Sequence, residues 1–96
     1  MRESTVEKHL KEQVELAGGE IRKLAWIGHR SAPDRAVFLN GVYFVETKRP
    51  GLDATQAQAR EHNKLRKHGA DVRVIDTKEK VDEFIREITR KKSSAA

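Results

Sequence analysis

The chain has 96 residues, enough for one small domain with a modest core and too few for a second. Hydrophobic and charged residues each make up 36%, a balance typical of a globular protein with a heavily charged surface. No apolar run approaches the roughly 20 residues of a membrane-spanning helix, and no charged-then-apolar leader opens the chain, so a cytoplasmic protein is expected. The absence of cysteine excludes disulfides and thiolate metal sites.

The formal net charge is +5. Such a charge favours a polyanionic partner, because lysine and arginine gain affinity by releasing counterions from phosphates. A basic surface with no specific partner is the alternative. Composition therefore indicates nucleic acid but names no reaction.

The first predicted element is a helix that stops at Gly18-Gly19. Its apolar residues recur at about one turn: Val6, Leu10, Val14 and Ala17. Ser4 and Glu7 have the spacing of a capping box. On this interpretation the Glu7 side chain only bonds back to the amide of Ser4.

A strand centred on residues 22–27 is expected next, with Trp26 packed in the core and base stacking as the alternative role for this residue. A loop over residues 28–33 then leads to Asp34. His29 and Arg30 lie in this loop, where they either contact a phosphate or remain solvated. The four histidines are scattered singly, so no zinc site is predicted.

A β-hairpin dominates the centre of the chain. Two apolar runs, residues 36–39 and 42–45, are joined by Asn40-Gly41, the dipeptide most typical of a tight hairpin turn. A strict two-residue turn would place Asp34 opposite Thr47 and on the face away from Glu46. Asp34 and Glu46 therefore meet only if the hairpin has a three-residue loop, a bulge or a bend at Asp34, and we predict such an irregularity between residues 34 and 42.

Charged side chains lie at the outer ends of this hairpin. Asp34 precedes the first strand, while Glu46 and Lys48 close the second. Side chains two apart on a strand point the same way at a spacing of roughly 7 Å. Two carboxylates at a sheet edge suit Mg²⁺, which completes its shell with water and phosphate. A nearby lysine suits an attacking water or a phosphorane oxygen, so the cluster indicates phosphodiester hydrolysis.

After Arg49-Pro50-Gly51 ends the pairing, a helix is predicted over residues 55–68, with Gly69 at its end. Thr55 and Gln58 have capping-box spacing, so Gln58 has a purely structural interpretation. The helix is basic and poor in large apolar residues. Its charged face is either simply solvated or follows a DNA backbone.

A short strand over residues 71–76 should pair alongside the strand that carries Glu46, through a crossover helix. A last helix is expected to begin near residues 76–79, where Asp76 and Glu79 have capping-box spacing. Its apolar stripe comprises Val81, Phe84, Ile85 and Ile88. Residues 1–90 are therefore interpreted as one domain, and residues 91–96 as a flexible basic tail.

The ordered set of Pro33-Asp34, a hairpin, and Glu46-x-Lys48 resembles the PD-(D/E)XK nuclease superfamily. Further details resemble its VRR-Nuc branch: Arg35 after Asp34, the run F-V-E-T-K-R-P-G over residues 44–51, a glutamine at the start of the next helix, and G-A-D-V-R-V-I-D before the last helix. The similarity covers residues 6–88. It implies an α/β fold in the order αβββαβα, a small mixed sheet flanked by helices like a minimal restriction-endonuclease core.

The resemblance also implies roles for particular residues. Metal ligands would be Glu7, Asp34, Glu46 and the backbone carbonyl of Thr47. Catalytic residues would be Asp34, Glu46, Lys48 and Gln58. The cofactor would be Mg²⁺ or Mn²⁺, with no small-molecule cofactor. Whether Gln56 or Gln58 faces the site stays open, although counting back from Gly69 favours Gln58.

The implied activity is that of a metal-dependent DNA endonuclease in a bacterial or phage-infected cell. A core this small favours recognition of DNA shape, such as a Holliday junction or other branched DNA, and the family analogy adds a homodimer. The alternative is a non-catalytic nucleic-acid-binding module with a degenerate site. A third interpretation treats Asp34, Glu46 and Lys48 as a surface ion-pair cluster.

Overall fold

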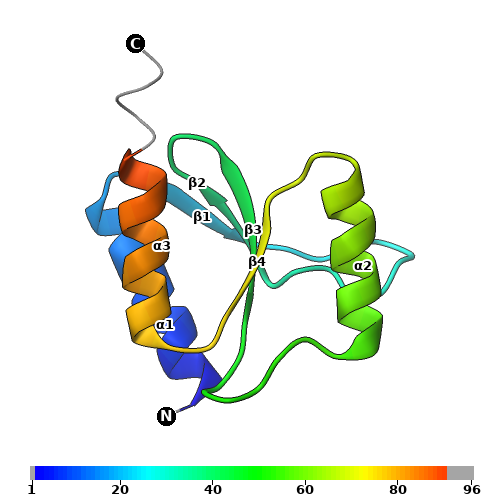
Figure 1. The fold of residues 1–96 in the computed structure, drawn as a ribbon. Helices are drawn as coiled ribbons and strands as arrows, with labels where there is room; N and C mark the ends of the chain where they lie inside the picture. Colours follow the sequence, from blue (N-terminus) through cyan, green and yellow to red (C-terminus); the bar gives the residue numbers. More distant parts are fainter. Residues whose placement is uncertain (1, 91–96) are drawn as a thin grey trace.

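The computed structural model describes residues 2–90. These residues form a four-stranded sheet and three helices in the predicted order αβββαβα (Figure 1). The elements are α1 (Glu3–Leu16), β1 (Glu20–Lys23), β2 (Arg35–Phe38), β3 (Val42–Thr47), α2 (Gln56–Lys67), β4 (Val72–Ile75) and α3 (Lys78–Arg90). The expected α/β fold class is confirmed, and residues 91–96, the predicted tail, lie outside the described residues.

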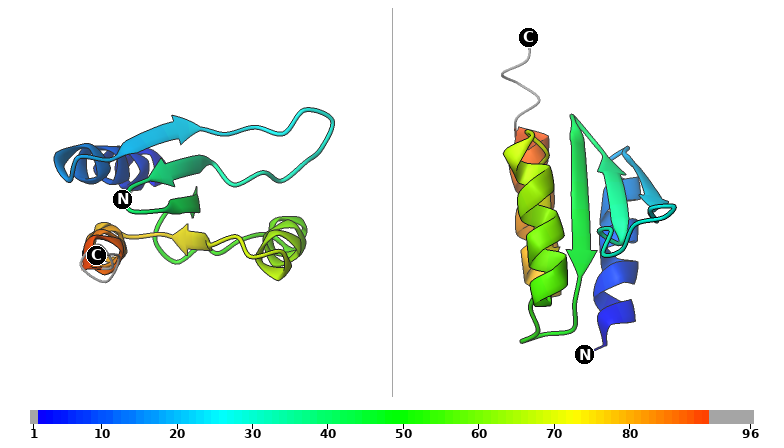
Figure 2. Two further views of the ribbon diagram at one scale, coloured as in Figure 1. Left: turned by 90° about the horizontal axis from the view of Figure 1, so that it is seen from above. Right: turned by 90° about the vertical axis from the view of Figure 1, so that its right-hand side faces the viewer.

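The sheet has the strand order β1-β2-β3-β4. The first three strands are antiparallel neighbours, whereas β3 and β4 are parallel and are connected through α2, as a parallel pair requires. Figure 2 shows α1 and α3 on one face of the sheet and α2 on the other. The long segment between β1 and β2 reaches across to the side of α2 (Figure 2). The sheet therefore separates two unlike layers.

The apolar core lies between the sheet and the layer formed by α1 and α3. Its buried members are Val6, Leu10, Val14, Ile21, Val37, Leu39, Tyr43, Val45, Ile75, Val81, Phe84 and Ile88. The helical stripes predicted for α1 and α3 supply half of them, because positions three and four apart share one helix face. By contrast, the buried residues of α2 are polar, namely Glu61 and His62. Among the described residues, no helix combines the length and apolar character needed to cross a membrane.

The hairpin shows the predicted irregularity. Phe38 pairs with Val42 and Arg35 with Val45, so three residues, 39–41, form the loop instead of two. Asn40 and Gly41 adopt φ angles of 54° and 142°, which Asn and Gly tolerate best. This one-residue shift in register brings Asp34 to the position across from Glu46, as a functional cluster requires.

The strand expected over residues 22–27 is shorter and lies earlier than predicted, because β1 ends at Lys23. Residues 24–34 leave the sheet as a loop, which we call the β1–β2 loop. Ile27 is fully exposed and Trp26 only half-buried, so the prediction that Trp26 packs in the apolar core is wrong. Its indole Nε1 instead donates a hydrogen bond of 2.8 Å to Glu61 of α2.

Two predicted helix caps also differ from the structure. Helix α1 begins at Glu3 with Arg2 as its N-cap, so Ser4 lies inside the first turn and forms no capping box with Glu7. At the start of α3, Thr77 rather than Asp76 caps the helix, its Oγ1 accepting from the amide of Lys80 at 3.1 Å. Helix α1 therefore starts two residues before the position that the spacing indicated, and α3 starts one residue after it.

Candidate active site

Asp34 lies in a bend directly before β2 and joins the ends of β2 and β3. Its Oδ2 accepts hydrogen bonds from the backbone amide of Thr47 at 3.0 Å and from the Thr47 hydroxyl at 3.1 Å. Its Oδ1 accepts no hydrogen bond from any described residue. Because a strand residue directs its N–H and C=O to the same side, the carbonyl of Thr47 also lies on the Asp34 side of β3.

Glu46 is the buried carboxylate of this site, with only 2% of its surface exposed. Its Oε2 accepts a hydrogen bond of 3.0 Å from Gln58 Nε2 and lies 3.5 Å from Lys48 Nζ. Its Oε1 is buried and has no hydrogen-bond partner within residues 2–90. A buried oxygen without a hydrogen-bond partner is energetically unfavourable unless a water molecule or an ion binds to it.

The electrostatic environment of Glu46 favours a bound positive charge. Burial, and after it the nearby charge of Asp34, raise the pKa of Glu46 to about 7 against the opposing effect of Lys48. The protein alone therefore does not fully offset the charge of this carboxylate. A cation that binds here would take the place of the proton.

Gln58 has both of the roles considered for it. Its side-chain Oε1 accepts a hydrogen bond from the backbone amide of Thr55, and its backbone amide donates one to the Thr55 hydroxyl. These two bonds complete the capping box of α2. Its Nε2 remains free to donate to Glu46. Gln56 is exposed at the first position of the helix, so the structure places Gln58 at the site.

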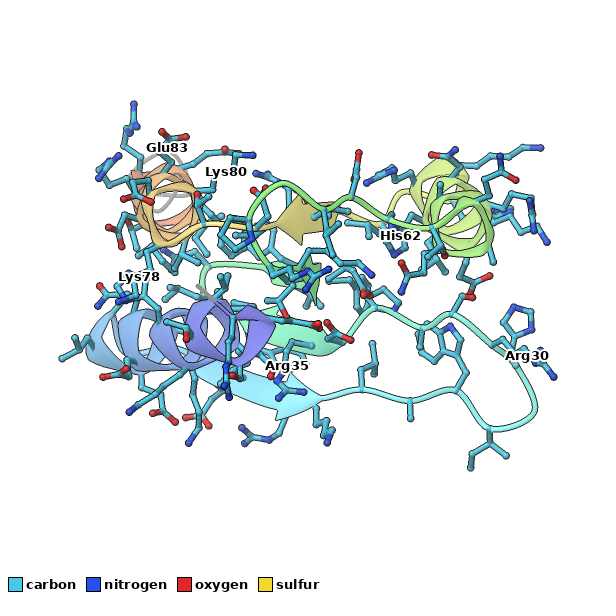
Figure 3. All side chains as sticks on the ribbon, turned by 90° about the horizontal axis from the view of Figure 1, so that it is seen from below. Arg30, Arg35, His62, Lys78, Lys80 and Glu83 are labelled. Atoms are coloured by element: carbon cyan, nitrogen blue, oxygen red, sulfur yellow. The ribbon has the colours of Figure 1, made fainter. Side chains whose placement is uncertain are left out.

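Glu7 lies in a different arrangement from the one that the resemblance implies. Its Oε1 forms an ion pair of 2.7 Å with Arg35 Nη2, and Figure 3 shows Arg35 beside the start of α1. The α1 residue whose charge acts on Glu46 is Glu3, which contributes to raising the pKa of Glu46. Glu7 is thus near the site through Arg35 and has no hydrogen bond to Glu46 or Asp34.

The donor set fits a hard divalent cation bound largely through water. Within the described part of the chain, no three His, Asp or Glu side chains are grouped as a ready metal site. Asp34 and Glu46 nevertheless each engage one oxygen in protein contacts and leave the other without one. Mg²⁺ binds proteins through one or two carboxylates and keeps several waters, so these two residues satisfy its usual requirement.

Sequence reasoning missed His62. It is 1% exposed, its Nε2 has no hydrogen-bond partner among the described residues, and Figure 3 shows it between α2 and the sheet. Burial and the charges of Arg66 and Lys48 lower the pKa of His62, so the ring is neutral beside the site. The signal was its position four residues after Gln58, on the same face of α2.

No protein-family model matches the chain. A protein from Acyrthosiphon pisum secondary endosymbiont phage 1, "Putative nuclease p44", is 43% identical over 81 residues, which span 82% of this chain and 87% of that protein. A solved structure described as "VRR_NUC domain" superposes with a TM-score of 0.81 at 39% identity, covering 88% of this chain and 94% of the other. The similarity therefore covers most of the chain.

Proposed function

Because this chain belongs to the VRR-Nuc family of nuclease domains, we propose that it is a DNA endonuclease that requires Mg²⁺ or Mn²⁺ at the edge formed by Asp34 and Glu46. Its family makes it a nuclease with a nucleic-acid substrate. The observation that carries the metal requirement is the buried, unpartnered Oε1 of Glu46.

Asp34, Glu46 and the backbone carbonyl of Thr47 would hold the ion. All three lie at the ends of β2 and β3, and Asp34 is already oriented by its bonds to Thr47. Glu7 would join them only after leaving Arg35, to which it is paired. When bound, the cation would act as a Lewis acid that polarises the phosphate and makes a water molecule more acidic.

The remaining residues position charge and water. The side chain of Lys48 is 14% exposed, and its ammonium lies beside Glu46, where it would stabilise the negative charge that develops on the phosphate and orient the attacking water. Gln58 holds Oε2 of Glu46 through its Nε2. That bond fixes which carboxylate oxygen is left for the cation.

We expect EDTA to abolish cleavage while leaving DNA binding largely intact. The net charge of +5 supplies phosphate contacts that do not depend on the ion. The measurement is cleavage of labelled DNA with EDTA, then after Mg²⁺ is restored, beside a gel-shift assay in EDTA. Cleavage that persists at full rate in the chelator would remove the metal from the mechanism.

We further propose that the enzyme prefers branched DNA and acts as a homodimer. Apart from the β1–β2 loop and residues 48–55, the connections of the described domain are short, so little surface is available to read a long base sequence. Two sites in a dimer would cut two strands of a junction. Incubation with four-way junctions, flaps, nicked duplex and plain duplex tests the preference, and sedimentation analysis tests the dimer; equal cutting of all four substrates would contradict the first proposal and a monomer the second.

A further inference from the structure

We propose that the cavity between the β1–β2 loop and α2 binds a backbone phosphate of the DNA strand next to the phosphate that is cut. This inference rests on the proposed nuclease function and assigns the substrate a second point of contact. The cavity is about 560 Å³. Its walls come from residues 28–31 of the loop and from Ala57, Arg60, Glu61 and Lys64 of α2.

The walls of this cavity are held in place. Glu61 is 8% exposed, and its two carboxylate oxygens accept from Trp26 Nε1 at 2.8 Å and bond to His29 Nε2 at 3.0 Å. Both partners belong to the loop, so one buried side chain of α2 fixes the loop at two points. Ser31 adopts a φ of 67°, uncommon for a residue other than glycine. The loop is thus a fixed wall, although it has no regular secondary structure.

Three cations line the cavity against one carboxylate, Glu61, whose charge acts on Lys64. Arg30, Arg60 and Lys64 are exposed and form no ion pair or hydrogen bond through their side chains with any described residue. Arg60 and Lys64 lie four apart on one helix face, where like charges destabilise a helix. Glu61 is the one carboxylate of the lining, and it is engaged by His29 and Trp26. The cavity therefore keeps an excess of positive charge, and such an excess favours binding of a phosphate.

The cavity also lies in the right place for a second phosphate. Ser31 in its wall is three residues before Asp34, a stretch that spans at most roughly 10 Å. Ala57 in the opposite wall directly precedes Gln58, which bonds to Glu46. Figure 3 shows Arg30 at the outer end of the loop, on the side of α2. A strand whose phosphate enters the active site would therefore pass this cavity within a few nucleotides.

The test compares the triple variant Arg30→Ala, Arg60→Ala, Lys64→Ala with Arg86→Ala, an exposed arginine of α3 outside the cavity. Binding of a labelled duplex and a labelled four-way junction is measured against salt concentration in EDTA. The triple variant should bind roughly tenfold more weakly, and its slope of log affinity against log salt should be shallower by about 1, the effect of losing one phosphate contact. Arg86→Ala should change neither quantity.

Kinetics in Mg²⁺ give a second readout, since loss of a contact made equally in ground and transition states raises KM and leaves kcat unchanged. Thermal melts of all variants verify folding. If the triple variant binds with the slope of the wild type, the cavity is an ordinary solvated basic surface and the inference is wrong, while the nuclease proposal stands. If the wild type binds neither the duplex nor the four-way junction, the proposed function itself is wrong.

Discussion

Replacing Lys48 with alanine should lower kcat roughly a hundred- to a thousandfold, the usual effect of removing one group that stabilises transition-state charge. The affinity for DNA should change only a few fold, because Lys48 is one of 20 basic residues and is mostly buried. Single-turnover cleavage in Mg²⁺ gives the rate, and a gel-shift assay in EDTA gives the affinity. The signature of catalysis is the separation of the two effects.

Lys23→Ala is the matched control, since it removes an exposed lysine from the end of β1. It should leave kcat unchanged. The opposite pattern, no cleavage by the wild type and a modest loss of affinity in Lys48→Ala, would support a binding module with a degenerate site. The geometry argues against that module, because a protein that only binds DNA has no use for the buried, unpartnered carboxylate oxygen of Glu46.

The hairpin shows both what local sequence predicts and where it stops. Asn40-Gly41 marks the turn, and alternating apolar residues mark the strands. The register of the hairpin depends on one extra residue in the loop. Asp34 stabilises this register by accepting hydrogen bonds from the backbone amide and the hydroxyl of Thr47. Requiring Asp34 to meet Glu46 was therefore the constraint that predicted the irregularity, since the turn dipeptide alone predicts the wrong register.

Contacts between distant segments could not be predicted in the same way. Trp26 is predicted to pack in the core because the apolar and aromatic residues around it suit a strand. Its hydrogen-bond partner is instead Glu61, 35 residues later. The Glu7–Arg35 pair likewise joins α1 to β2. The capping-box spacing at Ser4 also predicts the wrong start for α1, because the helix already begins at Glu3. Short-range patterns identify elements well, but side-chain partners across the sheet depend on how those elements pack.

The competing interpretations of Gln58 had no need to exclude one another. A glutamine at the third position of a helix has an acceptor and a donor on the same amide. The acceptor completes the capping box with Thr55, and the donor reaches Glu46. The start of α2 and the orientation of the buried carboxylate are thus coupled through one side chain, so the structural and functional roles support each other.

Glu46→Gln should abolish cleavage and yet stabilise the metal-free protein above neutral pH. The pKa of Glu46 rises from 4.5 to about 7 in the folded state, chiefly through burial. Below pH 4.5 the carboxyl is protonated in both the folded and the unfolded chain, so this contribution to stability is fully present. It is lost as the pH rises through the folded pKa, by about 3 kcal/mol in total.

The measurement is the free energy of unfolding in urea for wild type and Glu46→Gln, below pH 4.5 and above pH 7. Below pH 4.5 the two proteins differ only in a buried amide N–H in place of a buried carboxyl O–H. Subtracting this low-pH difference removes the effect of the amide group itself. The difference between the variants should then shift by about 3 kcal/mol in favour of glutamine across this interval. Glu12→Gln, an exposed substitution on α1, should show no such shift.

Adding Mg²⁺ above pH 7 should close this gap, because a cation between Asp34 and Glu46 stabilises the ionised wild type and has only one carboxylate to bind in the variant. This result tests metal binding without any measurement of cleavage. A stability difference that stays the same with and without Mg²⁺ would mean that the unpartnered oxygen of Glu46 is not a ligand. The metal requirement would then need a different carboxylate, and Glu7, released from Arg35, would be the next to test.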